Sequence, residues 1–171
     1  MFDIIICEDN NYQRQQIEAV IKEEILNSKL ECSIVLTTDE PELIIEYVEK
    51  NKNRTFLYFL DVELESKING IELAKIIRTL DSMGYIVFIT SHVELTMLTF
   101  QYKVQAMDYI VKDDFNNVKD KIIECIKEAY NDYKNINTKR TSAISISVGN
   151  KVVYFNLNDI LFLKLLLKII K

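Results

Sequence analysis

Residues 56–61 read FLYFLD, and these six residues indicate the class of fold. The run Phe56–Leu60 is apolar throughout, as expected of a central strand in a parallel sheet that helices cover on both faces. Asp61 then ends the run with a carboxylate. In sheets of this kind, ligands bind beyond the carboxyl ends of the strands. The stretch therefore predicts an α/β sheet with an acidic side chain at its binding edge.

Four further short apolar runs predict the remaining strands, at residues 2–7, 33–37, 85–89 and 107–111. Apolar residues recur at helical spacing in the segments between and after these runs. The predicted helices cover residues 12–26, a segment from Pro41, and residues 71–80, 95–102 and 118–134. Strands and helices that alternate with short connections are typical of a parallel sheet wrapped by helices. We therefore expect an α/β domain with a (βα)5 doubly wound parallel sheet.

Length and composition are those of an ordinary globular protein. The chain has 171 residues, 49% of them apolar and 27% charged, enough for one full domain but short for two. Cys7, Cys32 and Cys125 lack metal-ligand spacing, so we expect free thiols in a reducing cytoplasm. The first residues lack the basic segment of a signal peptide, and no segment before residue 160 is apolar enough to span a membrane. We expect a cytoplasmic protein without membrane insertion.

Charge divides the chain near residue 135. Residues 1–134 contain 15 Lys and Arg against 25 Asp and Glu, whereas residues 135–171 contain six basic residues and one acid, Asp159. The acidic part is unsuited to nucleic acid, because phosphate backbones are met mainly by Lys and Arg. We expect one domain over residues 1–134, a linker over 135–140 and a second segment over 141–171.

Five polar residues stand where predicted strands end. They are Glu8, Asp9, Asp61, Thr90 and Lys112. Three carboxylates at one edge of a sheet suit Mg²⁺, which prefers oxygen ligands. A carboxylate is also a nucleophile that accepts phosphoryl groups, while an amine and a hydroxyl can pair with the phosphoryl oxygens. Together these residues predict a magnesium-dependent phosphoryl acceptor.

Each residue also has an ordinary structural explanation. Glu8 and Asp9 can form a polar turn, Thr90 with the two residues after it can cap a helix, and Lys112 can be a solvated surface lysine. We expect His92 to be a loop residue near the pocket rather than a general base. Only the occurrence of all these residues at strand ends favours a shared site.

Residues 1 to about 130 resemble the receiver domain of two-component response regulators. The resemblance rests on ICED at 6–9, FLD at 59–61, NGIEL at 69–73, FITSH at 88–92 and MDYIVK at 107–112. It implies a flavodoxin-like receiver fold in which Asp61 is the phosphoacceptor and Lys112 and Thr90 engage the phosphoryl group. It further implies that Asp9, Glu8, Asp61 and the backbone carbonyl of Glu63 hold Mg²⁺, and that Thr90 and Tyr109 are switch residues.

A narrower resemblance is to the accessory gene regulator protein A branch, through TSHVELTMLTFQYKVQAMDYIVKDD at 90–114. In that branch a LytTR-type DNA-binding domain follows the receiver, and TSAISISVGNKVVYFNLNDILFL at 141–163 is similar to its first strands. The ending LKLLLKIIK at 163–171 departs from the family. We expect a short, β-rich, truncated N-terminal fragment of the LytTR-type domain, without specific DNA binding by this chain alone.

The resemblance implies a function in signal transduction rather than in metabolism. A sensor histidine kinase of the peptide quorum-sensing kind would phosphorylate Asp61 to control transcription. A homodimer would form through the face made by residues 95–102, the strand 107–111 and the helix 118–134. Two alternatives remain. The chain is a truncated receiver that only competes for the kinase or forms inactive heterodimers with an intact regulator, or it is a haloacid-dehalogenase-like phosphatase. The last requires an aspartate two residues after the nucleophile, where this chain has Glu63, so we expect no enzyme.

Overall fold

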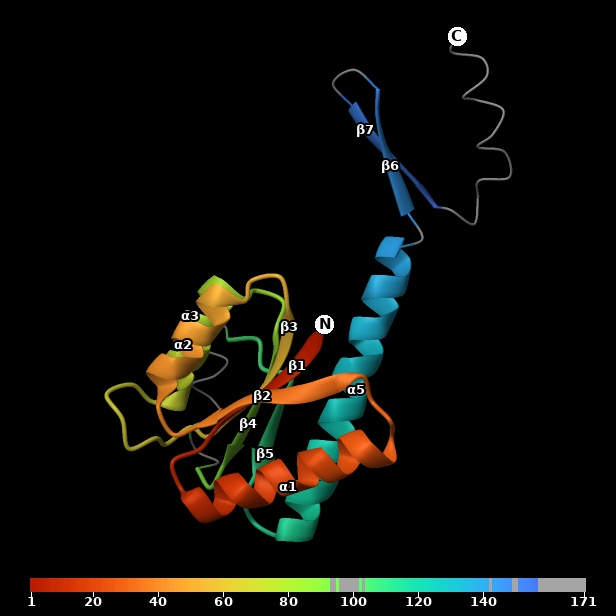
Figure 1. Ribbon diagram of the computed structural model, residues 1–171. Helices are drawn as coiled ribbons and strands as arrows, with labels where there is room; N and C mark the ends of the chain where they lie inside the picture. Colours follow the sequence, from red (N-terminus) through yellow and green to blue (C-terminus); the bar gives the residue numbers. More distant parts are fainter. Residues whose placement is uncertain (93–94, 96–101, 103, 142, 149–150, 157–171) are drawn as a thin grey trace. The chain divides into compact units, whose positions relative to one another are not determined.

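The computed structural model describes residues 1–92, 95, 102, 104–141, 143–148 and 151–156, which form two compact units, 1–130 and 131–171. The first unit is built on a five-stranded sheet in the order β2-β1-β3-β4-β5, in which every neighbouring pair is parallel (Figure 1). Its strands are β1 Phe2–Cys7, β2 Cys32–Thr38, β3 Thr55–Leu60, β4 Tyr85–Thr90 and β5 Asp108–Val111. The predicted flavodoxin-like receiver fold is confirmed.

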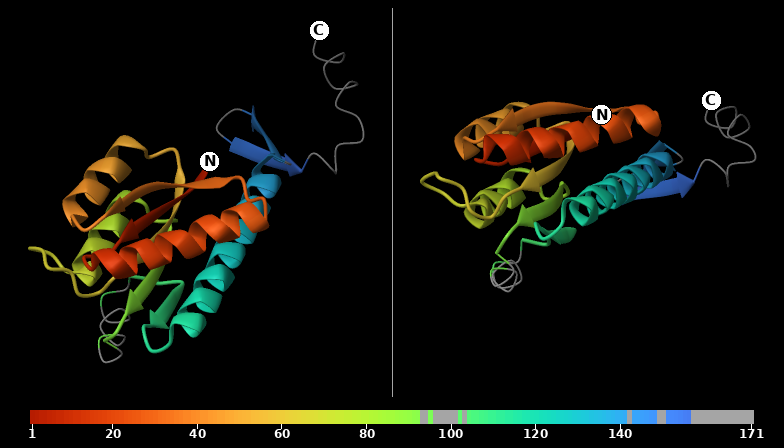
Figure 2. Two further views of the ribbon diagram at one scale, coloured as in Figure 1. Left: turned by 60° about the horizontal axis from the view of Figure 1, so that its bottom comes forward. Right: turned by 90° about the horizontal axis from the view of Figure 1, so that it is seen from below.

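Helices cover both faces of the sheet. They are α1 Asn11–Asn27, α2 Pro41–Lys50, α3 Gly70–Leu80 and α5 Phe115–Thr141. Helices α2 and α3 lie side by side on one face, and α1 and the first part of α5 lie on the other (Figures 1 and 2). Two ion pairs, Lys119 with Glu23 and Lys127 with Glu24, join α5 to α1.

The central strands are buried as their composition predicts. All six residues of β1 are buried, and Phe56–Leu60 in β3 is almost inaccessible to solvent. Burial of each large apolar side chain contributes about 1.5–3 kcal/mol to stability. This core holds the carboxyl ends of β1 and β3 side by side, since Cys7 pairs with Leu60 in the parallel register. The residues that follow these two strands are therefore neighbours.

Local capping signals place the helix starts. Pro41 is the first residue of α2, where its missing N–H is harmless. Asn69 caps α3, and its side chain and that of Glu72 form a reciprocal capping box. Asn10 caps α1 by accepting hydrogen bonds from the backbone N–H groups of Tyr12 and Gln13. The cap at Asn10 fixes the helix that follows the first two acids.

The last helix is longer than predicted. The sequence predicts this helix over residues 118–134 and a linker over 135–140, but α5 runs from Phe115 to Thr141 and the linker residues are helical. No glycine or proline interrupts this segment, so loss of apolar periodicity alone does not end the helix. The helix predicted over 95–102 lies mostly outside the described residues.

The second unit contains a two-stranded antiparallel sheet. Strand β6 is Ala143–Val148 and strand β7 is Lys151–Asn156. Its strands agree with the β-rich segment expected over 141–171, while residues 157–171, including the divergent ending, are outside the described part. Among the helices that the structure describes, none is both long enough and apolar enough to cross a membrane.

Candidate functional site

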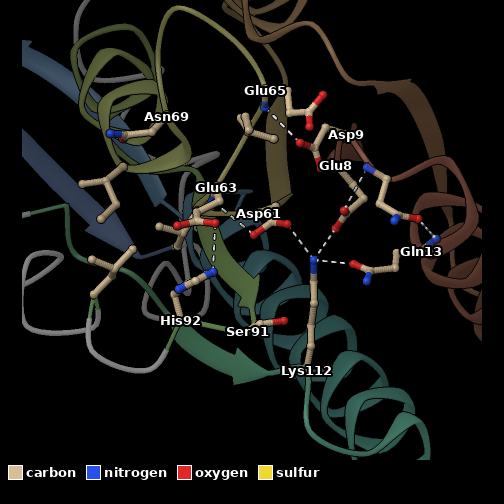
Figure 3. Close-up of a pocket in the computed structure, with 15 residues that line it drawn as sticks. Glu8, Asp9, Gln13, Asp61, Glu63, Glu65, Asn69, Ser91, His92 and Lys112 are labelled. Carbon is tan, nitrogen blue, oxygen red and sulfur yellow. Dashed lines mark hydrogen bonds and ion pairs between the residues drawn. The ribbon is translucent and has the colours of Figure 1, made fainter.

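A hollow of about 570 Å³ opens at the carboxyl edge of the sheet (Figure 3). Its walls are loops that follow β1, β3, β4 and β5, together with the start of α1. The residues that line it are Glu8, Asp9, Asn10, Gln13, Asp61, Val62, Glu63, Leu64, Glu65, Asn69, Ile71, Ser91, His92, Leu95 and Lys112. Five of the predicted site residues thus share one hollow, namely Glu8, Asp9, Asp61, Glu63 and Lys112.

Three carboxylates meet in this hollow. Glu8 and Asp9 follow β1, Asp61 follows β3, and each offers an oxygen within 4.8 Å of those of the other two. All three potential ligand atoms are carboxylate oxygens, which suit a hard cation such as Mg²⁺. The donor set therefore fits the ion that the sequence predicts.

Lys112 supplies the positive charge among these acids. Its Nζ lies 2.7 Å from Glu8 Oε2 and 2.6 Å from Asp61 Oδ2. The side chain reaches this position because its backbone N–H donates to the Thr90 carbonyl at 2.9 Å, which continues the pairing of β5 with β4. The ammonium thus reaches across the pocket to the ends of β1 and β3.

Glu8 is the most buried of the three clustered carboxylates, with 1% of its surface exposed. Burial raises the pKa of its carboxyl to about 7, because the charged form loses water, and the negative charge of Asp61 adds to the effect. The hydrogen bond and charge of Lys112 act in the opposite direction without cancelling the burial. Glu8 therefore exchanges its proton near neutral pH.

The loop between β3 and α3 packs tightly around Asp61. A Cβ atom added at Gly70 would lie 1.8 Å from the Asp61 carbonyl oxygen, so only glycine fits there. The backbone N–H of Glu63 donates to Asp61 Oδ1 at 3.3 Å, and that of Glu65 donates to Asp9 Oδ2 at 2.9 Å. These contacts hold the loop, and the backbone of Glu63, beside the acids.

Thr90 and Tyr109 lie beside the hollow rather than in its lining. Thr90 is the last residue of β4, is fully buried, and accepts the His92 backbone N–H on Oγ1 at 3.2 Å. Tyr109 donates its hydroxyl to the His92 carbonyl at 2.6 Å. His92 itself lines the hollow, with Nε2 2.9 Å from Glu63 Oε2, so its predicted place near the pocket is confirmed.

Two further residues, in the first turn of α1, contact the site although the sequence did not predict them there. Gln13 accepts a hydrogen bond from Lys112 Nζ on Oε1 at 2.6 Å. Arg14 donates from Nη1 to the backbone carbonyls of Glu8, at 2.5 Å, and Asp9, at 3.2 Å. The short spacing of Gln13 and Arg14 from Glu8 and Asp9 could have indicated this. A helix that begins directly after Asn10 places its first turn at the carboxyl edge of the sheet.

Comparison with known proteins agrees with this fold. The family model of the response regulator receiver domain matches residues 4–124. Accessory gene regulator protein A of Staphylococcus epidermidis is 40% identical over 160 residues, and that of Staphylococcus aureus is 41% identical over the same length. Each match covers 93% of this chain and 67% of the relative, so the chain spans about two thirds of their length.

Solved structures show the same fold at lower identity. The response regulatory domain of mrkE from Klebsiella pneumoniae superposes with a TM-score of 0.64 at 23% identity, covering 78% of this chain and 98% of that one. Response regulator TrrA from Thermotoga maritima, in complex with Mg²⁺-BeF, has a TM-score of 0.54 at 23% identity, with coverages of 73% and 99%. With the family model matching most of the chain, this protein belongs to the response regulator receiver family and is similar to accessory gene regulator protein A.

Proposed function

We propose that this chain accepts a phosphoryl group on Asp61. The observation that carries the proposal is the 2.6 Å contact between Asp61 Oδ2 and Lys112 Nζ inside a pocket that also holds Glu8 and Asp9. A nucleophilic carboxylate, a fixed cation and two further oxygen donors are the groups that phosphoryl transfer to aspartate requires.

In the proposed reaction, an Asp61 carboxylate oxygen forms a bond to phosphorus as the bond from phosphorus to a donor histidine nitrogen breaks. The electron pair of that bond returns to the imidazole. Glu8, Asp9, Asp61 and the Glu63 carbonyl would hold Mg²⁺, which when bound offsets the negative charge of the acids and of the incoming group. The chain is modified once per transfer, so we assign it no enzymatic turnover.

Phosphorylation would then shift the receiver between two conformations. The acyl phosphate formed on Asp61 would carry roughly two negative charges where the carboxylate carried one. Lys112 already faces this position, and the buried Thr90 hydroxyl would leave the His92 backbone N–H to donate to a phosphoryl oxygen. The Tyr109 hydroxyl is hydrogen-bonded to the His92 carbonyl. Movement of the backbone between Thr90 and His92 would therefore also move the Tyr109 side chain. The conformation with these contacts gains population after phosphorylation.

Relatives supply the setting of the proposal. By similarity to accessory gene regulator protein A, this protein would act in the cytoplasm and receive its phosphoryl group from a sensor histidine kinase of a peptide quorum-sensing pathway. Phosphorylation would then control transcription. A homodimer through the face formed by residues 95–102, β5 and α5 belongs to the same proposal. A gel-shift assay with promoter DNA distinguishes transcriptional control from a role limited to binding other proteins.

Incubation with phosphoramidate and Mg²⁺ tests the acceptor directly. Intact-protein mass spectrometry should show addition of one phosphoryl group to the unmodified chain and none to Asp61→Asn. Asp120→Asn changes an exposed aspartate on α5 and is the matched control, which should be labelled normally. Labelling of Asp61→Asn at the normal rate contradicts the proposal.

A further inference from the structure

Gln13 contacts the Lys112 ammonium group, which also contacts Glu8 and Asp61. Its Oε1 lies 2.6 Å from Lys112 Nζ, as close as Asp61 Oδ2 (Figure 3). We infer that Gln13 is a positioning residue, which holds the Lys112 ammonium toward Asp61 while the phosphoryl group is bound. The inference rests on the proposed function of Asp61.

The ammonium has one acceptor for each of its protons. A lysine ammonium has three N–H donors, and here they face Glu8 Oε2, Asp61 Oδ2 and Gln13 Oε1. Glu8 and Asp61 are also the residues whose bonding would change when a metal or a phosphoryl group binds. Gln13 is neutral and is neither a proposed metal ligand nor the proposed phosphoacceptor. Of the three contacts, its hydrogen bond to Lys112 alone can therefore persist through the reaction.

Gln13 also separates two hollows. A second hollow of about 150 Å³ lies between α1 and the start of α5, and among the residues that the structure describes Gln13 and Lys112 line both hollows. Asp113 and Asp114 line the second hollow and carry negative charge. An ammonium released by Gln13 would have these carboxylates as alternative partners. The amide of Gln13 therefore biases Lys112 toward Asp61.

The backbone of Gln13 is itself fixed to the end of β1. Its N–H donates to the side chain of the helix cap Asn10 at 3.1 Å. The next residue, Arg14, binds the carbonyls of Glu8 and Asp9 through its guanidinium. The first turn of α1 is thus tied to the acidic loop, which gives the Gln13 side chain a defined place from which to reach Lys112.

A double-mutant cycle tests whether Gln13 acts through Lys112. Calorimetry measures the affinity for beryllofluoride, a stand-in for the phosphoryl group, in the presence of Mg²⁺. Gln13→Met keeps the length of the side chain and removes the acceptor, and should weaken binding about tenfold, as expected for one hydrogen bond to a charged group. In a Lys112→Ala background the same change should weaken binding by less than about twofold, because the partner is already absent.

Gln15→Met is the matched control, since Gln15 lies on the same turn but is exposed and bonded to Asn11. It should bind beryllofluoride normally. An equal loss from Gln13→Met in both backgrounds, no loss at all, or the same loss from Gln15→Met overturns the inference. If Asp61→Asn binds as tightly as the unmodified chain, the proposed function fails and the inference with it. If beryllofluoride affinity depends on Asp61 but is unchanged by Gln13→Met, the inference about Gln13 is overturned while the proposed function stands.

Discussion

Lys112 Nζ lies 2.6 Å from Asp61 Oδ2 although 51 residues separate the two along the chain. The pair is largely removed from solvent, since Asp61 is 8% exposed. Loss of one partner from a buried ion pair leaves the other charge without compensation, which costs more than the intact pair contributes. The amine thus balances the acids of the pocket before any metal or phosphoryl group arrives.

Lys112→Ala should therefore destabilise the metal-free protein by about 3 kcal/mol. Mg²⁺ should raise the melting temperature of this variant more than that of the unmodified chain, because the ion replaces the lost positive charge. Thermal unfolding with Mg²⁺ and with a chelator measures both effects. Lys121→Ala removes an exposed ion pair with Glu124 and should leave the stability nearly unchanged. An equal Mg²⁺ response in Lys112→Ala and the unmodified chain would count against the prediction.

Loss of the proton from the Glu8 carboxyl should lower the free energy of unfolding of the metal-free protein as pH rises. Its pKa is about 7 in the folded chain against an ordinary 4.5, so the folded state binds the proton more tightly. The resulting stabilisation is complete below pH 4.5 and is lost as pH rises through 7. Relative to Glu8→Gln, the unmodified chain should lose up to about 3 kcal/mol between pH 5 and pH 8.

Urea unfolding at the two pH values, in buffer without divalent ions, measures this difference. Glu42→Gln changes an exposed glutamate in the first turn of α2 and should leave the pH dependence as it is. Parallel stability curves for Glu8→Gln and the unmodified chain would show that burial does not alter the titration of Glu8.

Gly70→Ala should impair both stability and phosphorylation. The added Cβ would meet the Asp61 carbonyl oxygen at 1.8 Å, so the backbone of one of the two residues must move. Crowding of this kind costs about 1–3 kcal/mol, and here it would displace the proposed phosphoacceptor, Asp61. Unfolding and the initial rate of labelling by phosphoramidate measure the two effects.

Gly84→Ala is the matched comparison for Gly70→Ala. Its added Cβ would meet the side chains of Asp81 and Tyr58, away from the pocket lining. It should destabilise the fold while the folded protein is still labelled at the normal rate. A normal labelling rate in Gly70→Ala would contradict the role given to this close approach.

Arg78→Lys should destabilise the domain by about 2 kcal/mol, although the charge is kept. The guanidinium donates to the backbone carbonyls of Val104 at 2.5 Å, Gly84 at 2.5 Å and Gln105 at 2.9 Å. A lysine ammonium cannot reproduce this planar set of donors. Chemical unfolding measures the loss, with the exposed neighbour Thr79→Ala as control. Unchanged stability would show that these contacts are dispensable.

Much of the fold was predictable because its signals are local. The apolar run of β3, Pro41 at the start of α2 and the cap Asn69 each act within a few residues. The acids at the strand ends were predictable for a related reason, since parallel strands bring their carboxyl ends to one edge. The end of α5 was not, because residues 135–140 lack both apolar periodicity and a helix-breaking residue.

The alternation of strands and helices, and with it the set of residues at one edge of the sheet, follows from local sequence patterns. The strand order, the raised pKa of Glu8 and the convergence of Gln13 with Asp61 on Lys112 arise when the chain packs in three dimensions. The difference comes from separation along the chain. Periodicity and capping act between near neighbours, whereas burial and the meeting of these side chains depend on crossovers that pack α1 and β5 against the same edge.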